Sequence, residues 1–336
     1  MKICVFGAGA IGSVVAARLG AAAGRGRGGD EISVVARGAQ LEAIAERGLR
    51  LVDSEGTDIT VALRASNDPA ALGPQDLVIA ALKGHQLPAA APGIAALLGP
   101  GTRVVMVLNG VPWWYFHGVE GANRDRRLPA LDPDGALWDR IGPARVIGCV
   151  AYCSATVEAP GLVRQTGGRY FALGEPTGAM TEDLARAARL FDAAGLGAAA
   201  TARIRDEIWA KLLYNAALNP LSALTGGTAR EMAHDPGVAE VARRVMTEVR
   251  AVGSALGARI DADVDGLIEG AKGMGAVKSS MLQDLERGRP LEVDGILGAV
   301  ASLGRVAGVP TPTLDTVLAV VSLRGRLAAG RARLSG

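Results

Sequence analysis

Residues 2–12 read KICVFGAGAIG, and this stretch decides the fold. A short apolar run over residues 2–6 passes directly into the pattern G-x-G-x-x-G. The pattern alone is weak evidence. Here, however, it lies between an expected strand and an alanine-rich helix over residues 13–23, the context in which such a loop binds a dinucleotide. The free N–H groups and the positive dipole end of that helix favour an anion.

Each glycine of this loop has an expected purpose. Gly7 permits the tight turn, Gly9 removes a side chain where a pyrophosphate must approach, and Gly12 lets helix and sheet pack closely. The competing interpretation is a plain strand-turn-helix that binds nothing. We predict binding, and the predicted cofactor-binding loop comprises Gly7, Ala8, Gly9, Ala10, Ile11 and Gly12.

The end of the second expected strand, residues 31–36, discriminates between NAD and NADP. An acidic residue at this position would bind the ribose 2′-hydroxyl of NAD. Arg37 stands there instead, in VVARG, and a cation suits the 2′-phosphate of NADP. We therefore predict NADPH/NADP as the cofactor, against the alternative of a surface arginine that happens to follow a strand.

Strands and helices alternate through the first half of the chain. The apolar segments 76–82 and 102–108 read as strands that run into Lys83 and Asn109. Such alternation with all-apolar strands predicts a parallel sheet covered by helices on both faces. Ligands bind at the carboxyl ends of these strands, so Lys83 and Asn109 are predicted to contact cofactor or substrate. The alternatives are a solvated charge and a simple Asn-Gly turn.

The second half of the chain has a different pattern. Residues 112–143 hold three of the four tryptophans and read as an excursion, and 24–29 reads as a loop. From about Asp206 the pattern is almost entirely helical, including 277–286 and 293–307. The expected fold is an α/β Rossmann-type dinucleotide-binding domain followed by an all-α domain. The expected boundaries are residues 1–202 for the first, including the excursion 112–143, and 203–336 for the second.

A stripe of polar residues marks one expected helix, EIWAKLLYNAALNP over residues 207–220. Lys211, Asn215 and Asn219 follow one another at intervals of four and therefore lie on one face. Such a stripe faces water, a polar network or a ligand. With a nicotinamide cofactor it gains a chemical meaning, because reduction of a ketone leaves an alkoxide that needs a proton donor and positive charge. A lysine can supply both.

Composition limits the classes of partner. A net charge of +2, with dispersed arginines, does not indicate nucleic acid or an anionic membrane. No apolar run approaches the roughly 18 residues needed to span a bilayer, and the N-terminus does not read as a signal peptide. The three cysteines lack metal-ligand spacing and are expected to be reduced. We predict a cytoplasmic protein without a metal, and the C-terminal helices are compatible with a homodimer.

These features together resemble the ketopantoate reductases (2-dehydropantoate 2-reductases), members of the 6-phosphogluconate-dehydrogenase-like superfamily. The resemblance covers nearly the whole chain and implies a Rossmann domain plus a helical domain, with the active site in the cleft between them. It rests on GAGAIG (7–12), Arg37, LKGHQ (82–86), NG (109–110), EIWAKLLYNAALNPLSAL (207–224) and SSMLQDLERGRPLEVDGILG (279–298).

The resemblance implies a role for each candidate residue. Lys211 would be the general acid that protonates the C2 oxygen as NADPH delivers hydride to C2. Glu292 would hydrogen-bond the substrate's oxygens and help to place the lysine. Arg37 and Lys83 match cofactor-binding residues. The residues implied to bind substrate are Asn109, Asn215, Asn219 and Ser280, with Asn109 also near the nicotinamide.

The implied activity is NADPH-dependent reduction of 2-dehydropantoate (ketopantoate) to pantoate, a step of pantothenate and coenzyme A biosynthesis. Three departures concern the identity of the acid. Leu297 stands where family members commonly carry an asparagine, and Ala229 stands where some members place a substrate-binding asparagine. The segment 112–143 is longer than the usual connection. Two alternatives remain open: an NADPH-dependent reductase of another 2-oxo acid, and a non-catalytic NADP-binding paralogue.

Overall fold

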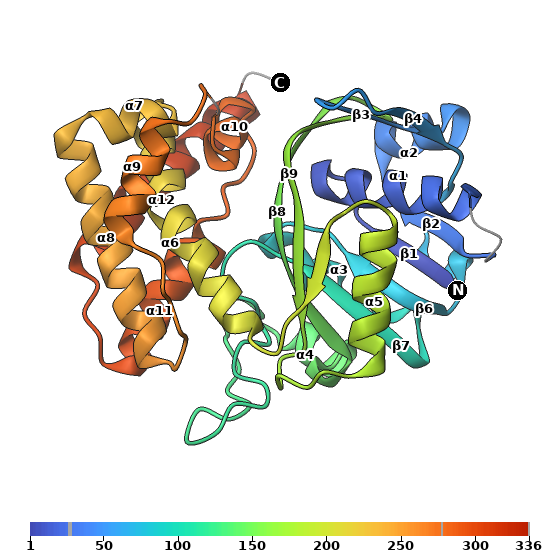
Figure 1. The fold of residues 1–336 in the computed structure, drawn as a ribbon, viewed down its shortest axis with the longest axis horizontal. Coiled ribbons are helices and arrows are strands. Elements are labelled where there is room, and N and C mark those ends of the chain that lie inside the picture. The colour runs from blue at the N-terminus through green and yellow to red at the C-terminus, as the bar shows by residue number, and fades with distance from the viewer. Residues whose placement is uncertain (26–28, 277, 335–336) are drawn as a thin grey trace. The chain divides into compact units, whose positions relative to one another are not determined.

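The computed structural model describes residues 1–25, 29–276 and 278–334, so part of the loop expected at 24–29 lies outside the described residues (Figure 1). The chain forms two compact units. The first comprises Met1–Leu108 and Trp113–Ile204, and the second comprises Asn109–Pro112 and Arg205–Gly336. Four residues from the middle of the chain therefore pack with the C-terminal helices rather than with the strands that flank them.

One sheet forms the centre of the first unit. Among the described residues it has ten strands in the order β4-β3-β9-β8-β7-β6-β1-β2-β5, with β10 paired to β9. The strands are β1 (Lys2–Phe6), β2 (Glu31–Val35), β3 (Leu49–Asp53), β4 (Asp58–Val61), β5 (Arg64–Ser66), β6 (Gln75–Ala80), β7 (Leu98–Val107), β8 (Val146–Ala159), β9 (Leu162–Gly174) and β10 (Ala198–Ala200).

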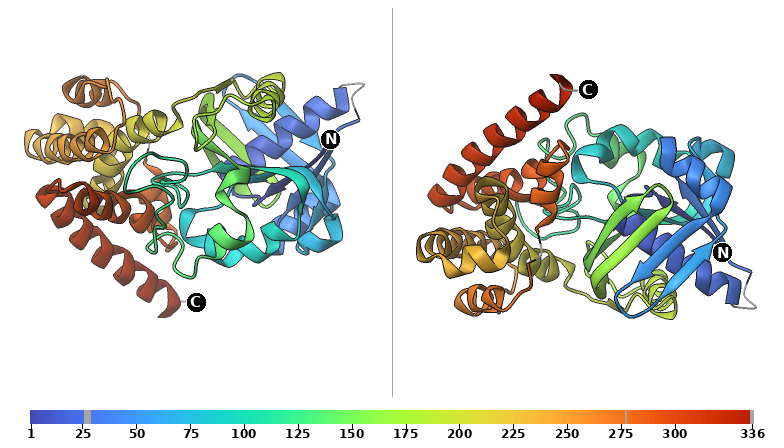
Figure 2. Two further views of the ribbon diagram at one scale, coloured as in Figure 1. Left: turned by 90° about the horizontal axis from the view of Figure 1, so that it is seen from below. Right: turned by 90° about the horizontal axis from the view of Figure 1, so that it is seen from above.

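The sheet is mixed: the parallel part predicted from the apolar strands is present, and antiparallel pairs extend it. The strands β1, β2, β6 and β7 are parallel to their neighbours, as expected. However, β8 and β9 pair antiparallel, and so do β3 and β4. A tight connection at Pro160 and Gly161, the latter at φ 77°, turns the chain straight back on itself. Figure 2 shows the green pair β8–β9 beside the blue strands β3 and β4.

Both faces of this sheet are covered. The helices of the first unit are α1 (Ala10–Arg25), α2 (Gly38–Arg47), α3 (Leu87–Ala95), α4 (Ala136–Arg140) and α5 (Glu182–Ala193), with short 3₁₀ turns η1 (Pro69–Leu72), η2 (Gly84–Gln86) and η3 (Pro143–Arg145). On one face α1 and α5 bury Val15 and Phe191 in the main core. On the other face Gly93 of α3 lies against the ring of Phe6.

The excursion 112–143 contributes to the core of the first unit. Its only regular helix in the described chain is α4, yet Trp113, Trp114, Tyr115 and Phe116 are each at most 2% exposed. Trp114 lies so close to Gly148 of β8 that a Cβ there would stand 2.5 Å from the indole. The aromatic run therefore covers part of the sheet face opposite α1.

Helices make up the second unit. They are α6 (Ile204–Thr225), α7 (Ala229–His234), α8 (Pro236–Ala255), α9 (Val264–Lys272), α10 (Ser280–Glu286), the π-helix η4 (Asp294–Gly298), α11 (Ala299–Ala307) and α12 (Pro312–Leu334). Trp209 of α6 is fully buried against α8, where Gly253 leaves room for its indole. The helix predicted at 277–286 begins at Ser280, and residue 277 lies outside the described residues.

The predicted fold class, a Rossmann-type α/β domain followed by an all-α domain, is confirmed. Within the described chain, no helix has both the length and the apolar character that crossing a bilayer requires.

Candidate active site

The glycine loop of the first unit combines two tightly packed positions with one open position. Gly7 has φ 107°, and a Cβ there would lie 2.7 Å from Leu82 Cδ2. A Cβ at Gly12 would lie 1.9 Å from the carbonyl oxygen of Gly7. A Cβ at Gly9 would meet nothing within 4 Å. The first and third glycines are thus required by the chain's own packing, whereas the second leaves space above the loop that suits a pyrophosphate.

Arg37 and Lys83 follow the two strands that neighbour β1. Val35 at the end of β2 accepts a 3.0 Å hydrogen bond from the N–H of Gly7, and exposed Arg37 follows two residues later as the N-cap of α2. On the other side of β1, Ala81 donates to Phe6 at 2.9 Å, and half-buried Lys83 follows as the N-cap of η2. All the predicted cofactor residues except Asn109 therefore lie at one edge of one sheet.

The polar stripe of the second unit lies on α6. Lys211 donates a 2.7 Å hydrogen bond from Nζ to Oδ1 of Asn109. Asn215 is half-buried on the next turn, and Asn219 is only 5% exposed one turn further. The buried indole of Trp209 fixes how α6 is rotated, and so fixes the side on which the stripe lies.

The Asn-Gly turn is held against the π-helix η4. Gly110 has φ 84°, and a Cβ there would lie 2.2 Å from the carbonyl oxygen of Gly295. The same oxygen accepts a 2.9 Å hydrogen bond from the N–H of Val111. Gly295 stands three residues after half-buried Glu292. The second unit thus brings Lys211 and Asn109 into contact. It also packs the turn that carries Asn109 against the segment that carries Glu292. Single π-turns of this kind occur often at functional sites.

Ser280 is placed differently from the stripe. It is exposed at the first position of α10, whereas its neighbour Ser279 is the N-cap and accepts a 3.1 Å hydrogen bond from the N–H of Leu282. The Ser279 hydroxyl also bonds that of buried Ser222 on α6. Sequence reasoning missed Ser279, although a serine just before an apolar helix is the usual N-cap signal.

The two departures from the expected asparagines are core positions. Leu297 is fully buried in η4, and Ala229 is 8% exposed behind the capping residue Thr228 of α7. Apolar side chains suit both places.

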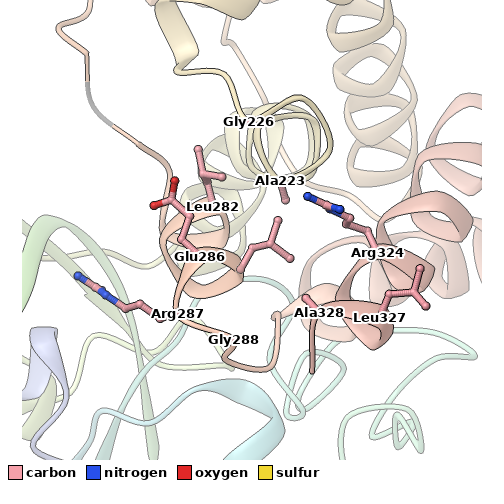
Figure 3. Close-up of a pocket in the computed structure, with 10 residues that line it drawn as sticks. Ala223, Gly226, Leu282, Glu286, Arg287, Gly288, Arg324, Leu327 and Ala328 are labelled. Carbon is pink, nitrogen blue, oxygen red and sulfur yellow. The ribbon is translucent and has the colours of Figure 1, made fainter. Parts of the chain in front are cut away.

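A cavity of about 530 Å³ lies elsewhere in the second unit, among the end of α6, α10 and α12 (Figure 3). Its lining comprises Ala223, Gly226, Leu282, Leu285, Glu286, Arg287, Gly288, Arg324, Leu327 and Ala328. None of the predicted site residues is among these, so the cavity is a separate feature.

The thiol of Cys4 in β1 is fully buried. Burial raises the pKa of the Cys4 thiol to about 11, which keeps it protonated and unreactive. Among the described residues, no three His, Cys, Asp or Glu side chains are grouped as a metal site would require.

Comparison with known proteins identifies both halves of the chain. The family model "Ketopantoate reductase PanE/ApbA" matches residues 3–178, and "Ketopantoate reductase PanE/ApbA C terminal" matches 203–324. The 2-dehydropantoate 2-reductase of Mesorhizobium japonicum is 51% identical, over 96% of this chain and 97% of that protein. A crystal structure of a candidate ketopantoate reductase from Ralstonia solanacearum MolK2 is 41% identical with a TM-score of 0.90, covering 97% and 98% of the two chains.

More distant structures share the fold alone. D-mandelate dehydrogenase, solved with NADH and anilino(oxo)acetate, is 22% identical with a TM-score of 0.80, covering 98% of this chain and 99% of that one. A dimeric ketopantoate reductase from Staphylococcus aureus is 20% identical with a TM-score of 0.75, covering 98% and 100%. From two family models and a 51% identical relative over nearly the full length, we conclude that this chain belongs to the ketopantoate reductase family of oxidoreductases.

Proposed function

We propose that this protein is a cytoplasmic enzyme that reduces 2-dehydropantoate to pantoate with NADPH, as a step of pantothenate and coenzyme A biosynthesis. The single observation that carries the proposal is the contact between Lys211 Nζ and Asn109 Oδ1, which holds an ammonium on the polar face of α6. The 51% identical relative bears the name of this activity.

In the proposed mechanism Lys211 is the general acid. When bound, NADPH supplies the hydride that C2 of the oxo acid receives. Lys211 donates a proton to the C2 oxygen as negative charge develops there, which yields the hydroxyl group of pantoate. Asn109 restrains the ammonium, and Glu292 accepts hydrogen bonds from the substrate's hydroxyl. Asn215, Asn219 and Ser280 donate to the remaining oxygens.

We further propose that residues 1–202 bind NADP and that 203–336 bind the oxo acid. The glycine loop receives the pyrophosphate, because Gly9 leaves open space above a helix N-terminus. Arg37 binds the 2′-phosphate, since the edge beyond β2 carries a cation where an NAD site carries an acid. Lys83, beyond the strand on the other side, contacts the same cofactor.

Turnover of NADPH with a panel of 2-oxo acids tests the proposal. We expect the highest kcat/KM with 2-dehydropantoate. A higher value with another branched or aromatic 2-oxo acid would establish the second candidate, a reductase of that acid. One observation favours this candidate: D-mandelate dehydrogenase, which was solved with anilino(oxo)acetate, shares the fold. No turnover with any acid, together with NADPH binding, would establish a non-catalytic paralogue.

We also propose that the enzyme forms a homodimer through α12. Val320, Leu323 and Leu327 are each about half exposed and lie on one face of this helix. The cavity lined by Leu282, Leu285 and Leu327 adjoins this apolar ridge. A ridge beside a hollow suits a two-fold interface, in which each copy offers the same surface to the other. Light scattering should report a dimer for the wild type and a monomer for Leu323→Asp. Met180→Asp is the control, because it places the same charge at another exposed apolar position, in the first unit, and should leave the dimer intact.

A further inference from the structure

We propose that Gly110 is a positioning residue for the reaction proposed above, because its backbone contact with Gly295 holds Asn109 against Lys211. We call this contact the 110–295 clamp. The inference rests on the proposed function, since it assigns the clamp's effect to the proton-donating lysine.

The clamp is a contact between two backbones. A Cβ on residue 110 would stand 2.2 Å from the carbonyl oxygen of Gly295, 2.6 Å from its carbonyl carbon and 3.2 Å from the nitrogen of Ile296. Backbone atoms cannot move aside as the end of a flexible side chain can. The φ of 84° at Gly110 further excludes most L residues. The 2.9 Å hydrogen bond from the N–H of Val111 to the carbonyl oxygen of Gly295 sets how closely the two backbones approach.

The requirement for glycine is one-sided. A Cβ on Gly295 would have its nearest neighbour, the carbonyl oxygen of Asn109, at 3.9 Å, which is ordinary van der Waals contact. Gly295 also has no positive φ, because it lies within the π-helix η4. Alanine at 295 therefore leaves the clamp intact, whereas alanine at 110 forces the turn away from η4. The chain thus offers a matched pair of glycine substitutions at one contact.

The turn carries the residue that touches the lysine. Asn109 directly precedes Gly110, and its Oδ1 lies 2.7 Å from Lys211 Nζ. A lysine ammonium has three N–H donors on a flexible stem, so an amide that holds one of them restricts where the others point. Displacing the turn by about 1 Å would break this restraint, and misplacement of that size can cost about 100-fold in rate. The clamp therefore acts through Asn109 on Lys211.

Kinetics of Gly110→Ala and Gly295→Ala, measured with the full-length enzyme and its best 2-oxo acid, test the clamp. We expect Gly110→Ala to lower kcat about 100-fold and to keep an NADPH affinity near that of the wild type. Its thermal midpoint should fall, because the added Cβ overlaps the backbone of Gly295. Gly295→Ala should keep wild-type kcat. In an Asn109→Ala background, Gly110→Ala should cost little more, because both changes remove the same restraint.

The outcomes separate the two proposals. If the wild-type enzyme turns over a 2-oxo acid and Gly110→Ala has the same kcat, the clamp is overturned and the proposed function stands. Additive losses in the double variant overturn it too, because they assign Gly110 to general stability. A wild type without turnover on any 2-oxo acid overturns both. Should Gly110→Ala not fold, Gly295→Val adds methyl groups beyond the Cβ that faces Asn109, and unchanged kcat in that variant overturns the clamp.

Discussion

Lys211 and Asn109 are 102 positions apart in the chain, yet their side chains meet in a hydrogen bond of 2.7 Å. Lys211 lies on α6, whereas Asn109 lies on a turn that leaves the sheet and packs with the helical unit. The pair places a cation and an amide at the same point. The proposed chemistry depends on this ammonium and its place on α6.

Lys211→Ala should lower kcat by about 10²- to 10⁴-fold, the usual contribution of a general acid. NADPH affinity should be retained, because the predicted cofactor residues of the first unit are untouched. Lys278→Ala is the matched control, since this lysine of the same unit pairs at 2.6 Å with Glu286. Steady-state kinetics and NADPH fluorescence provide the measurements. Near-normal turnover of Lys211→Ala would remove this lysine from the mechanism.

Glu292→Ala should raise KM for the oxo acid and also lower kcat, because the carboxylate is proposed to bind substrate and to help place the lysine. Asp294→Ala is the control, as this exposed acid lies two residues away at the start of η4. If KM stays unchanged in Glu292→Ala, the residue only precedes the start of η4 and has no contact with substrate.

Arg37→Asp should raise KM for NADPH about 10- to 100-fold, as expected for the loss of a charge-assisted hydrogen bond. KM for NADH should change little, because NADH lacks the 2′-phosphate. Arg47→Asp tests general electrostatics, since Arg47 is an exposed arginine on the same helix α2. Equal rises for the two cofactors would contradict the assignment of Arg37.

Gly9→Ala and Gly12→Ala should separate binding from folding. A Cβ at Gly9 meets no protein atom within 4 Å, so this variant should keep its thermal midpoint and lose NADPH affinity. A Cβ at Gly12 overlaps the carbonyl of Gly7, so Gly12→Ala should destabilise the fold by about 1–3 kcal/mol or more. Calorimetry and NADPH titration decide. Wild-type affinity in Gly9→Ala would show that the loop is only a structural turn.

Asp53 should make the first unit sensitive to acid. Burial alone would raise the pKa of Asp53, but hydrogen bonds from Thr57, from the Glu55 N–H and from Arg18 outweigh it and lower the pKa to about 2. Its folded pKa lies below its unfolded pKa. Ionised Asp53 therefore adds stability above pH ~4, about 2 kcal/mol in size, and this is lost as pH falls towards 2.

The free energy of unfolding should be measured for the wild type and for Asp53→Asn, from about pH 7 down to about pH 2–3. The variant should be less stable at neutral pH, because Arg18 then lacks its 2.8 Å partner in a buried place. Its loss of stability in acid should be shallower than that of the wild type. Asp58→Asn, which breaks a half-exposed pair with Arg50, should change little. Parallel acid profiles for wild type and Asp53→Asn would contradict the prediction.

The sequence by itself determined the features that depend on near neighbours in the chain. The glycine spacing of residues 7–12 predicted a strand-turn-helix, because the turn at Gly7 and the close packing of Gly12 on the Gly7 carbonyl lie within one βα unit. The interval of four between Lys211, Asn215 and Asn219 predicted one face of α6, because helical geometry is local. The family resemblance followed from such short segments and is confirmed.

Only the tertiary structure decided the rest. The antiparallel pair β8–β9 lies inside the sheet, and the aromatic run at 113–116 lies in the core rather than on a surface loop. Ser279 rather than Ser280 links α10 to α6, and Asn109 meets Lys211 through a turn that fits against Gly295. The place of the β8–β9 hairpin in the sheet depends on its pairing with β3 and β7, and the other contacts likewise join residues far apart in sequence. Periodicity carries no information about such contacts, because they are selected by the packing of whole elements.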